Sequence, residues 1–255
     1  MKNWDSLNLF HHYVLEIADN TLILGQQLCE WCGHGPILEQ DIALSNIALD
    51  LLGQSRLYYQ YLSESTGGNF KEDDFLMYRD ARKYRNSLLV EMPNGNWGTT
   101  ITRQFLFDQF HILLLQKLSE SSDQRLAEIA VKSIKEVKYH QRFSAEWVIR
   151  LGDGTQESHV IMQDSVDELY KYTCDFFVST EADQYAASNG ICAIPTEFEQ
   201  LYYANVNGIL QEATLKIPEI KKPIYSGKKG YHTEKLGYIL AELQYMENMY
   251  PNCEW

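Results

Sequence analysis

Two carboxylates stand on the apolar side of predicted helices, where a charge is costly. Asp50 shares a helical line with Ile47 and Leu57, and Asp108 lies on a line that includes Phe105. An ionised carboxylate removed from water costs several kcal/mol unless a metal ion, a cation, a hydrogen-bond network or a proton compensates it. Metal-dependent oxygen chemistry is one interpretation of these acids, and internal pairing within the fold is the other.

A pair of iron ions that activates oxygen needs carboxylates for charge and bridging, and imidazoles as neutral ligands. In helical carboxylate bundles, two helices each supply one Glu and two others each supply Glu-x-x-His. This sequence departs from that spacing, because Gly53 stands three residues after Asp50 and His140 comes four residues after Glu136. The positions that correspond to such a site are Glu30, Asp50, Gln54, Asp108, Glu136, Lys138 and His140. We expect a vestigial site here, with no metal and no catalytic residue.

Without a metal, a cation has to balance the inward acids. Lys138 falls on a helical line with Ile134 and Ala145, so we expect its ammonium to reach the interior. His140 is the other candidate, as an imidazolium. The spacing does not rank these two residues. Either would form a buried ion network that specifies packing more than it adds stability.

Helices are expected to carry all of these residues. Four long helices are predicted over 4–32, 36–64, 99–118 and 123–151, the last capped by Ser122 or Asp123. Shorter helices are predicted over 73–90, 157–177, 197–215 and 233–249, with an irregular basic segment over 216–230 that holds Pro218 and Pro223. No alternating strand pattern of useful length occurs. We expect an all-α fold, a four-helix bundle with additional C-terminal helices, as a single domain over 1–255, with the core bundle over about 4–151 and the additions over 153–255.

Composition narrows the function classes. The formal net charge is −13, from 35 acidic and 22 basic residues, which disfavours nucleic acid and anionic membranes as partners. No run of about 18 apolar residues and no signal peptide is found, so we expect a cytoplasmic protein. The five cysteines are scattered and do not suggest a disulfide framework, and the Cys29–Cys32 pair lies inside a helical pattern with no second pair for zinc. Seventeen Tyr and five Trp favour a protein interface.

Six segments carry a resemblance to a known family. They are EWCGH (30–34), DIALSNIALDLLGQ (41–54), NSLLVEMPNG (86–95), KEVKYH (135–140), RLGDGT (150–155) and GKKGYHTEKLG (227–237). In this order, over nearly the whole chain, they resemble the PaaC family, the C subunits of ring 1,2-phenylacetyl-CoA epoxidases.

The resemblance implies a ferritin-like fold and a structural, noncatalytic role in phenylacetate degradation. In that family the C subunit pairs with a catalytic A subunit, which holds two irons and binds the CoA thioester, and a B subunit joins the pairs. A reductase with flavin and an iron–sulfur centre supplies electrons from NADPH. The complex adds one oxygen atom of O2 across the aromatic ring of phenylacetyl-CoA. The resemblance therefore implies no cofactor in this chain itself.

The resemblance also implies that two segments lie near the CoA end of the catalytic partner. The matching positions are Ala81, Arg82, Lys83 and Tyr84, and then Ala182, Asp183 and Gln184. Arg and Lys suit phosphate binding, although an ordinary solvated helix face also explains them, and Ala81 departs from the acid that is commoner in the family. The alternatives are a di-iron oxygenase or ferroxidase that binds metal in its own bundle, and a free-standing regulatory or CoA-binding module.

Overall fold

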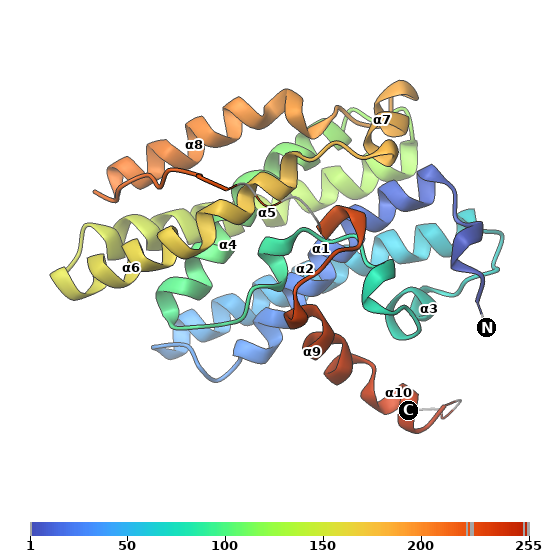
Figure 1. Ribbon diagram of the computed structural model, residues 1–255, viewed down its shortest axis with the longest axis horizontal. Helices are drawn as coiled ribbons and strands as arrows, with labels where there is room; N and C mark the ends of the chain where they lie inside the picture. Colours follow the sequence, from blue (N-terminus) through green and yellow to red (C-terminus); the bar gives the residue numbers. More distant parts are fainter. Residues whose placement is uncertain (1, 223, 225–226, 252, 254–255) are drawn as a thin grey trace.

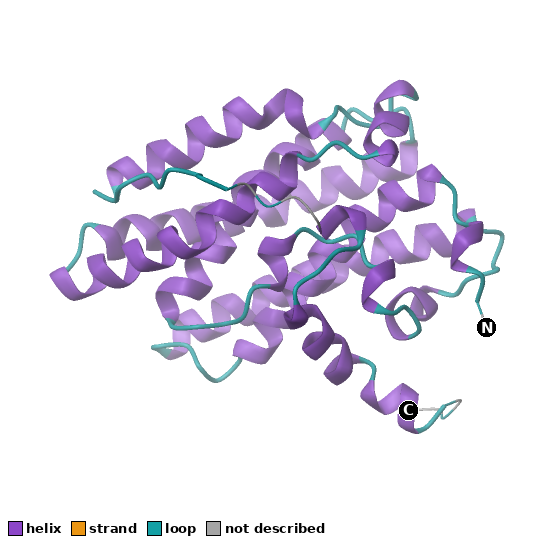
Figure 2. Ribbon diagram, viewed as in Figure 1, coloured by secondary structure: helices purple, strands orange, loops and turns teal. Residues whose placement is uncertain are grey.

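The computed structural model describes residues 2–222, 224, 227–251 and 253. Four long helices form its body: α1 (Leu9–Trp31), α2 (Leu38–Ser65), α4 (Trp97–Leu118) and α5 (Gln124–Gly152) (Figure 1). The described residues form helices and loops, with no strand (Figure 2). None of the helices among them is both long and apolar enough to cross a membrane. The all-helical bundle expected from the sequence is confirmed.

The four long helices pack as two antiparallel pairs. α1 lies along α2, α4 lies along α5, and α2 meets α5. The turn between α1 and α2 closes on Asp41, whose carboxylate accepts hydrogen bonds from the backbone N–H groups of Gly33 at 2.9 Å and Gly35 at 3.1 Å. Asp123 caps α5 through the N–H of Leu126 at 3.0 Å, as its position predicted.

Shorter elements cover the bundle. α6 (Gln156–Leu169) and α8 (Glu199–Glu212) pack on α4 and α5, and α7 (Glu181–Ser188) packs on α1. The 3-10 helices η3 (Leu88–Glu91) and η4 (Tyr170–Phe177) lie against α4, and η3 also touches α1. Covered on every side, α4 is buried from residue 100 to residue 115.

The helix predicted over 73–90 is wrong. This segment forms α3 (Glu72–Met77), the 3-10 turn η2 (Ala81–Lys83) and η3. Its backbone N–H groups donate to side chains of other elements. The N–H of Arg85 donates to Asp19 Oδ2 at 2.8 Å, and the N–H of Leu88 donates to Asp175 Oδ2 at 2.9 Å. Because these N–H groups bond across the fold, they are not free to bond along a helix.

Other boundaries differ by smaller amounts. The first helix begins at Leu9 rather than Trp4, and η4 continues the 157–177 prediction as a 3-10 helix. The last helix divides at Gln244 into α9 (Glu234–Leu243) and α10 (Tyr245–Met249). In the 195–215 region η5 (Pro195–Phe198) precedes α8, whereas α7 was not expected. Of the 216–230 segment, Gly227–Lys229 form a 3-10 turn, η6, and Pro223 lies outside the described residues.

Candidate functional site

The centre of the bundle holds polar contacts between α2 and α5. Gln54 Nε2 donates to Glu136 Oε2 at 2.9 Å, and His140 Nε2 lies 3.0 Å from Asp50 Oδ2. The side chain of His140 is fully buried, whereas that of Asp50 is 40% exposed. The Asp50–His140 contact therefore joins the bundle interior to the surface between α2 and α5.

Asp108 lies deeper, on α4, and protein groups satisfy both of its oxygens. Oδ1 accepts from Gln104 Nε2 at 2.7 Å, and Oδ2 accepts from Ser144 Oγ at 2.7 Å. Burial raises the pKa of Asp108 to about 7, against the opposing effects of the His140 charge and the two hydrogen bonds. The burial of Asp108 is thus compensated by two hydrogen bonds and by partial protonation near neutral pH.

His111 stands one helical turn after Asp108 and is also buried. Burial, followed by the His140 charge, lowers the pKa of His111 to about 3, so its ring is neutral at physiological pH. Neither of its ring nitrogens has a hydrogen-bond partner among the described residues. His111 therefore brings no positive charge to the centre.

The residues at the centre do not fit a pair of irons. Within residues 2–222, 224, 227–251 and 253, no group of three or more His, Cys, Asp and Glu is placed to hold a metal ion. Glu30 is exposed on α1, and its Oε2 accepts from Asn94 Nδ2 at 3.3 Å, so the expectation that Glu30 faces the site is wrong. Gln54 Nε2 is used in its bond to Glu136, and both oxygens of Asp108 accept from protein groups, whereas Gln54 Oε1 has no hydrogen-bond partner among the described residues.

Lys138 is not the internal cation. It is exposed, because the buried side of α5 runs through Val137, His140 and Ser144 instead of the line assumed for Lys138. Of the two candidates, His140 is the one that contacts an acid of the site, Asp50. Helical spacing alone did not choose between the line of Lys138 and that of His140. The two lines lie about 100° apart around α5, and each includes apolar residues at helical spacing.

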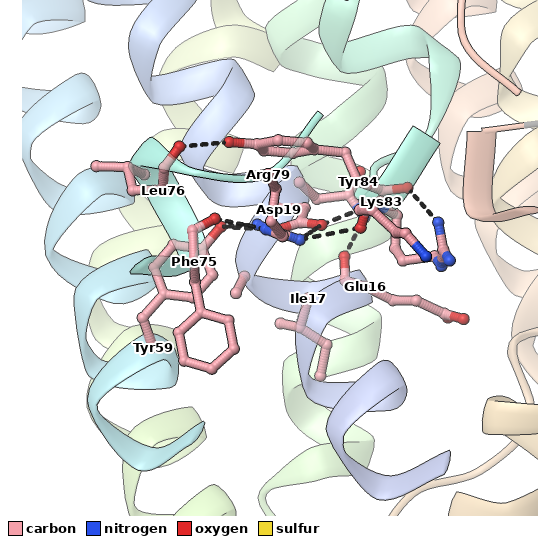
Figure 3. A network of polar contacts seen from close by, with 12 residues as sticks. Glu16, Ile17, Asp19, Tyr59, Phe75, Leu76, Arg79, Lys83 and Tyr84 are labelled. Carbon is pink, nitrogen blue, oxygen red and sulfur yellow. Dashed lines mark hydrogen bonds and ion pairs between the residues drawn. The ribbon is translucent and has the colours of Figure 1, made fainter. Parts of the chain in front are cut away.

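A fully buried charged network lies outside this centre, between α1 and the segment after α3. Arg79 Nη1 and Nη2 donate to Asp19 Oδ2 and Oδ1 at 2.9 and 2.6 Å, and Tyr59 OH donates to Oδ1 at 2.6 Å (Figure 3). The guanidinium carbon lies 4.1 Å from the centre of the Tyr84 ring. Burial alone lowers the pKa of Arg79, but the Asp19 carboxylate outweighs it, so the pKa lies above its usual value. Both side chains are closed to solvent.

Sequence reasoning missed this pair. Neither Arg79 nor Asp19 stood out among the candidate inward charges. The available signal was an acid within the long apolar stretch from Tyr13 to Leu24, of the same kind that singled out Asp50 and Asp108.

Two further buried clusters hold the segment 227–233. Lys228 Nζ lies 2.9 Å from Glu16 Oε2 and 2.6 Å from Asp183 Oδ2. Burial raises the pKa of Glu16 to about 7, with the Lys228 charge opposing it. His232 Nδ1 lies 2.8 Å from Glu91 Oε2, and its Nε2 lies 3.1 Å from the Tyr84 carbonyl oxygen. The segment 227–233 thus ties the 81–84 turn to the start of α7.

The seven positions suggested for the CoA end fall into two groups. Arg82 and Gln184 are exposed, and Lys83 is half-buried with its Nζ 2.7 Å from Asp5 Oδ1. Tyr84, Ala182 and Asp183 are buried, and Ala81 is half-buried. A ligand at the surface would therefore meet Arg82 and Gln184 before the others.

Comparison with known proteins identifies relatives of the whole chain. The family model described as "Phenylacetic acid catabolic protein" matches residues 3–255. The chain is also similar to a protein of Escherichia coli (strain K12) that is named as the C subunit of 1,2-phenylacetyl-CoA epoxidase. The two share 44% identity over 249 residues, which cover 98% of this chain and 100% of the relative.

Removing Arg79 should strongly destabilise the fold. Arg79→Met leaves the Asp19 carboxylate buried without its cation, so we expect a loss of roughly 3–5 kcal/mol in the free energy of unfolding. The double variant Asp19→Asn with Arg79→Met should recover part of that loss. Urea denaturation measures all three proteins. Arg142→Met, which breaks an exposed pair with Glu146 at 4.0 Å, is the control and should cost under about 1 kcal/mol; equal losses for the two Arg variants would contradict this account.

Asp108 should make the fold less stable as the pH rises. Its pKa is about 7 in the folded chain against an ordinary value of 3.8, so the folded state keeps a proton that the unfolded state releases. The unfolding free energy should therefore fall between about pH 4 and 7, and Asp108→Asn should remove on the order of 2–4 kcal/mol of that fall. Denaturation midpoints across this pH range, with the exposed Asp153→Asn as control, test it. Parallel curves for wild type and Asp108→Asn would contradict it.

Proposed function

Because the chain belongs to the family of phenylacetic acid catabolic proteins, we propose that it is the C subunit of a 1,2-phenylacetyl-CoA epoxidase and that its role there is structural. The observation that supports this role is the bundle centre, where Gln54, Ser144 and a partly protonated Asp108 stand in place of a metal-binding set. The chemistry then belongs to a partner. This partner is the catalytic A subunit, with two irons and the CoA thioester, to which a reductase with flavin and an iron–sulfur centre delivers electrons from NADPH.

Metal analysis tests the structural role directly. We expect the chain purified from iron-supplemented cells to hold well under one iron per chain, because no group of three or more His, Cys, Asp and Glu converges in the part of the chain that the structure describes. Inductively coupled plasma mass spectrometry gives the ratio. Two irons per chain would reject the proposal in favour of an oxygenase or ferroxidase in its own right.

One side of the bundle is left open for such a partner. The α1–α4 side is covered by η3, and the α4–α5 side is covered by α6 and α8. Across α2 and α5 no other helix packs extensively in the described part of the chain. In the order α1, α2, α5, α4 around the bundle, the open α2–α5 side lies opposite the α1–α4 side.

The exposed side chains of α2 and α5 suit a protein interface. Leu49 is 64% exposed, Ile42 is 50% exposed and Tyr139 is 42% exposed. Along α5 the ring of Phe143 lies 6.0 Å from that of Tyr139 and 6.5 Å from that of Trp147. Apolar and aromatic side chains of this kind, when contiguous, mark surfaces that a partner covers. The face also adjoins the half-exposed Asp50, so a partner seated there would bury the Asp50–His140 contact.

A charge on this face should weaken pairing with the catalytic subunit. Leu49→Lys places an ammonium where the partner would exclude water, so we expect at least a tenfold loss of affinity, about 1.4 kcal/mol or more. Isothermal titration calorimetry with the purified catalytic subunit measures it. Leu201→Lys, at a 52%-exposed leucine on α8, is the matched control and should bind as wild type. Unchanged affinity for Leu49→Lys would exclude the α2–α5 face as the docking site.

For the CoA end we propose a contact from Arg82, since Lys83 is already paired with Asp5 and Tyr84 is buried. An exposed guanidinium can donate to a CoA phosphate of the ester bound by the partner. Arg82→Glu should then raise the Michaelis constant of the complex for phenylacetyl-CoA by about three- to tenfold and change turnover less. Steady-state kinetics of the reconstituted complex measure this constant, and Arg125→Glu, at another exposed arginine, is the control. An unchanged Michaelis constant would remove Arg82 from the site.

A further inference from the structure

The C-terminal arm, defined as α9 and α10 (residues 234–249), runs away from the bundle and ends near the C-terminus (Figure 1). Its inner side packs on α1, η2 and η3 through the buried Leu236 and Leu240. These contacts are on the α1 and η3 side of the molecule, across the bundle from the α2–α5 face. The arm is therefore a surface separate from the one proposed above.

Hydrogen bonds fix the arm along its length. At its base, Glu91 Oε1 accepts from the N–H of Thr233 at 2.7 Å. At its middle, Gln244 Nε2 donates to the carbonyl oxygens of Leu76 and Arg79, each at 2.9 Å. These anchors come from buried or half-buried groups, so the arm holds one position before any partner arrives, and binding to it costs less ordering.

The outer side of the arm is unusually apolar for a solvent-facing helix. Its exposed large side chains are Tyr238 at 64%, Tyr245 at 55%, Met246 at 46% and Met249 at 54%. Tyr and Met are enriched at protein interfaces because they offer large contact areas with adaptable or amphipathic ends. Beside the arm, a groove of about 1280 Å³ lies between α10 and α3, and apolar side chains such as Trp4, Met77 and Met246 line it. Its charged lining residues are Lys2, Lys71, Asp73, Asp74 and Glu247, of which Lys2 pairs with Asp74 at 2.7 Å.

The size of the groove and the charges of the arm restrict its occupant. The groove is larger than the roughly 300–1,000 Å³ of small-molecule sites, so it fits a protein segment better than a metabolite. The arm carries Glu234, Glu242 and Glu247 against Lys235, a net charge of −2. A second copy of the chain, itself at −13, would be repelled, whereas a segment with Lys or Arg beside apolar side chains would be attracted.

We propose that the C-terminal arm is a second docking surface, which takes an apolar, basic segment of a protein subunit other than the one on the α2–α5 face. The inference rests on the proposed function only in taking that subunit from the same epoxidase complex. This chain then joins two different subunits through two sides of its bundle, and the anchored segment 227–233 links the arm to the body.

Two sets of variants separate the surfaces. The arm variant Tyr245→Ser, Met246→Ser, Met249→Ser removes the apolar contacts, and the variant Val160→Ser, Leu201→Ser, which changes exposed apolar side chains on α6 and α8, is its control. The full chain is co-expressed with the remaining epoxidase subunits, and assemblies are resolved by native mass spectrometry. We expect the arm variant to keep the catalytic subunit and to bind a second subunit at least tenfold more weakly, while Leu49→Lys does the reverse.

The arm proposal has its own failure outcomes. It is overturned if the arm variant assembles as wild type does, if it loses the subunit that Leu49→Lys loses, or if the wild-type chain binds no second subunit. Failure of the α2–α5 docking face is seen separately, as unchanged pairing of Leu49→Lys with the catalytic subunit.

A second variant removes doubt about folding. Glu242→Lys changes one exposed side chain of α9, so we expect the melting temperature to stay unchanged. The affinity for the second subunit should nevertheless fall at least threefold. The binding of that subunit should also fall as the salt concentration rises from about 0.05 to 0.5 M. Affinity that is independent of both the Glu242 charge and salt would overturn the basic character assigned to the occupant.

Discussion

The pairing of Asp19 with Arg79 is the contact on which much of this architecture depends. A carboxylate and a guanidinium closed to solvent are tolerated because two hydrogen bonds of 2.9 and 2.6 Å join them and Tyr59 OH donates a third bond to the carboxylate. The same carboxylate accepts the backbone N–H of Arg85, so it also sets the path of the chain after α3. The segment 79–91 is therefore ordered by charge and hydrogen bonding from α1, and its own secondary structure is limited to the short 3-10 helices η2 and η3.

Buried acids recur through the fold, and protein groups of different kinds compensate each of them. Glu16 lies against Lys228, Glu91 lies against His232, and Asp108 is raised toward protonation by burial and held by Gln104 and Ser144. Cations and hydrogen-bond donors from this chain thus occupy the positions beside the acids that a metal would need. A rigid, internally neutralised bundle is suited to support a neighbouring catalytic subunit, which is the role proposed here.

The two proposed docking surfaces follow from what packs on each side of the bundle. The α1–α4 and α4–α5 sides carry further helices, whereas α2 and α5 expose Leu49 and Tyr139, the chain neighbours of Asp50 and His140. On the opposite side, the anchored arm presents Tyr and Met side chains over an acidic background. The arm adds glutamates to its apolar side chains, which favours a basic partner there.

The sequence by itself determined the all-helical fold, the four long helices to within a few residues at most ends, the cap at Asp123 and the inward position of Asp108. These follow from apolar spacing and local capping, which are properties of one segment at a time. The tertiary structure alone decided that Lys138 and Glu30 face solvent, that 79–91 is not a helix, and that Asp19 meets Arg79. The physical reason is that helical periodicity gives an angle around one axis, whereas burial and pairing depend on which neighbours cover that angle and which distant side chains reach the backbone.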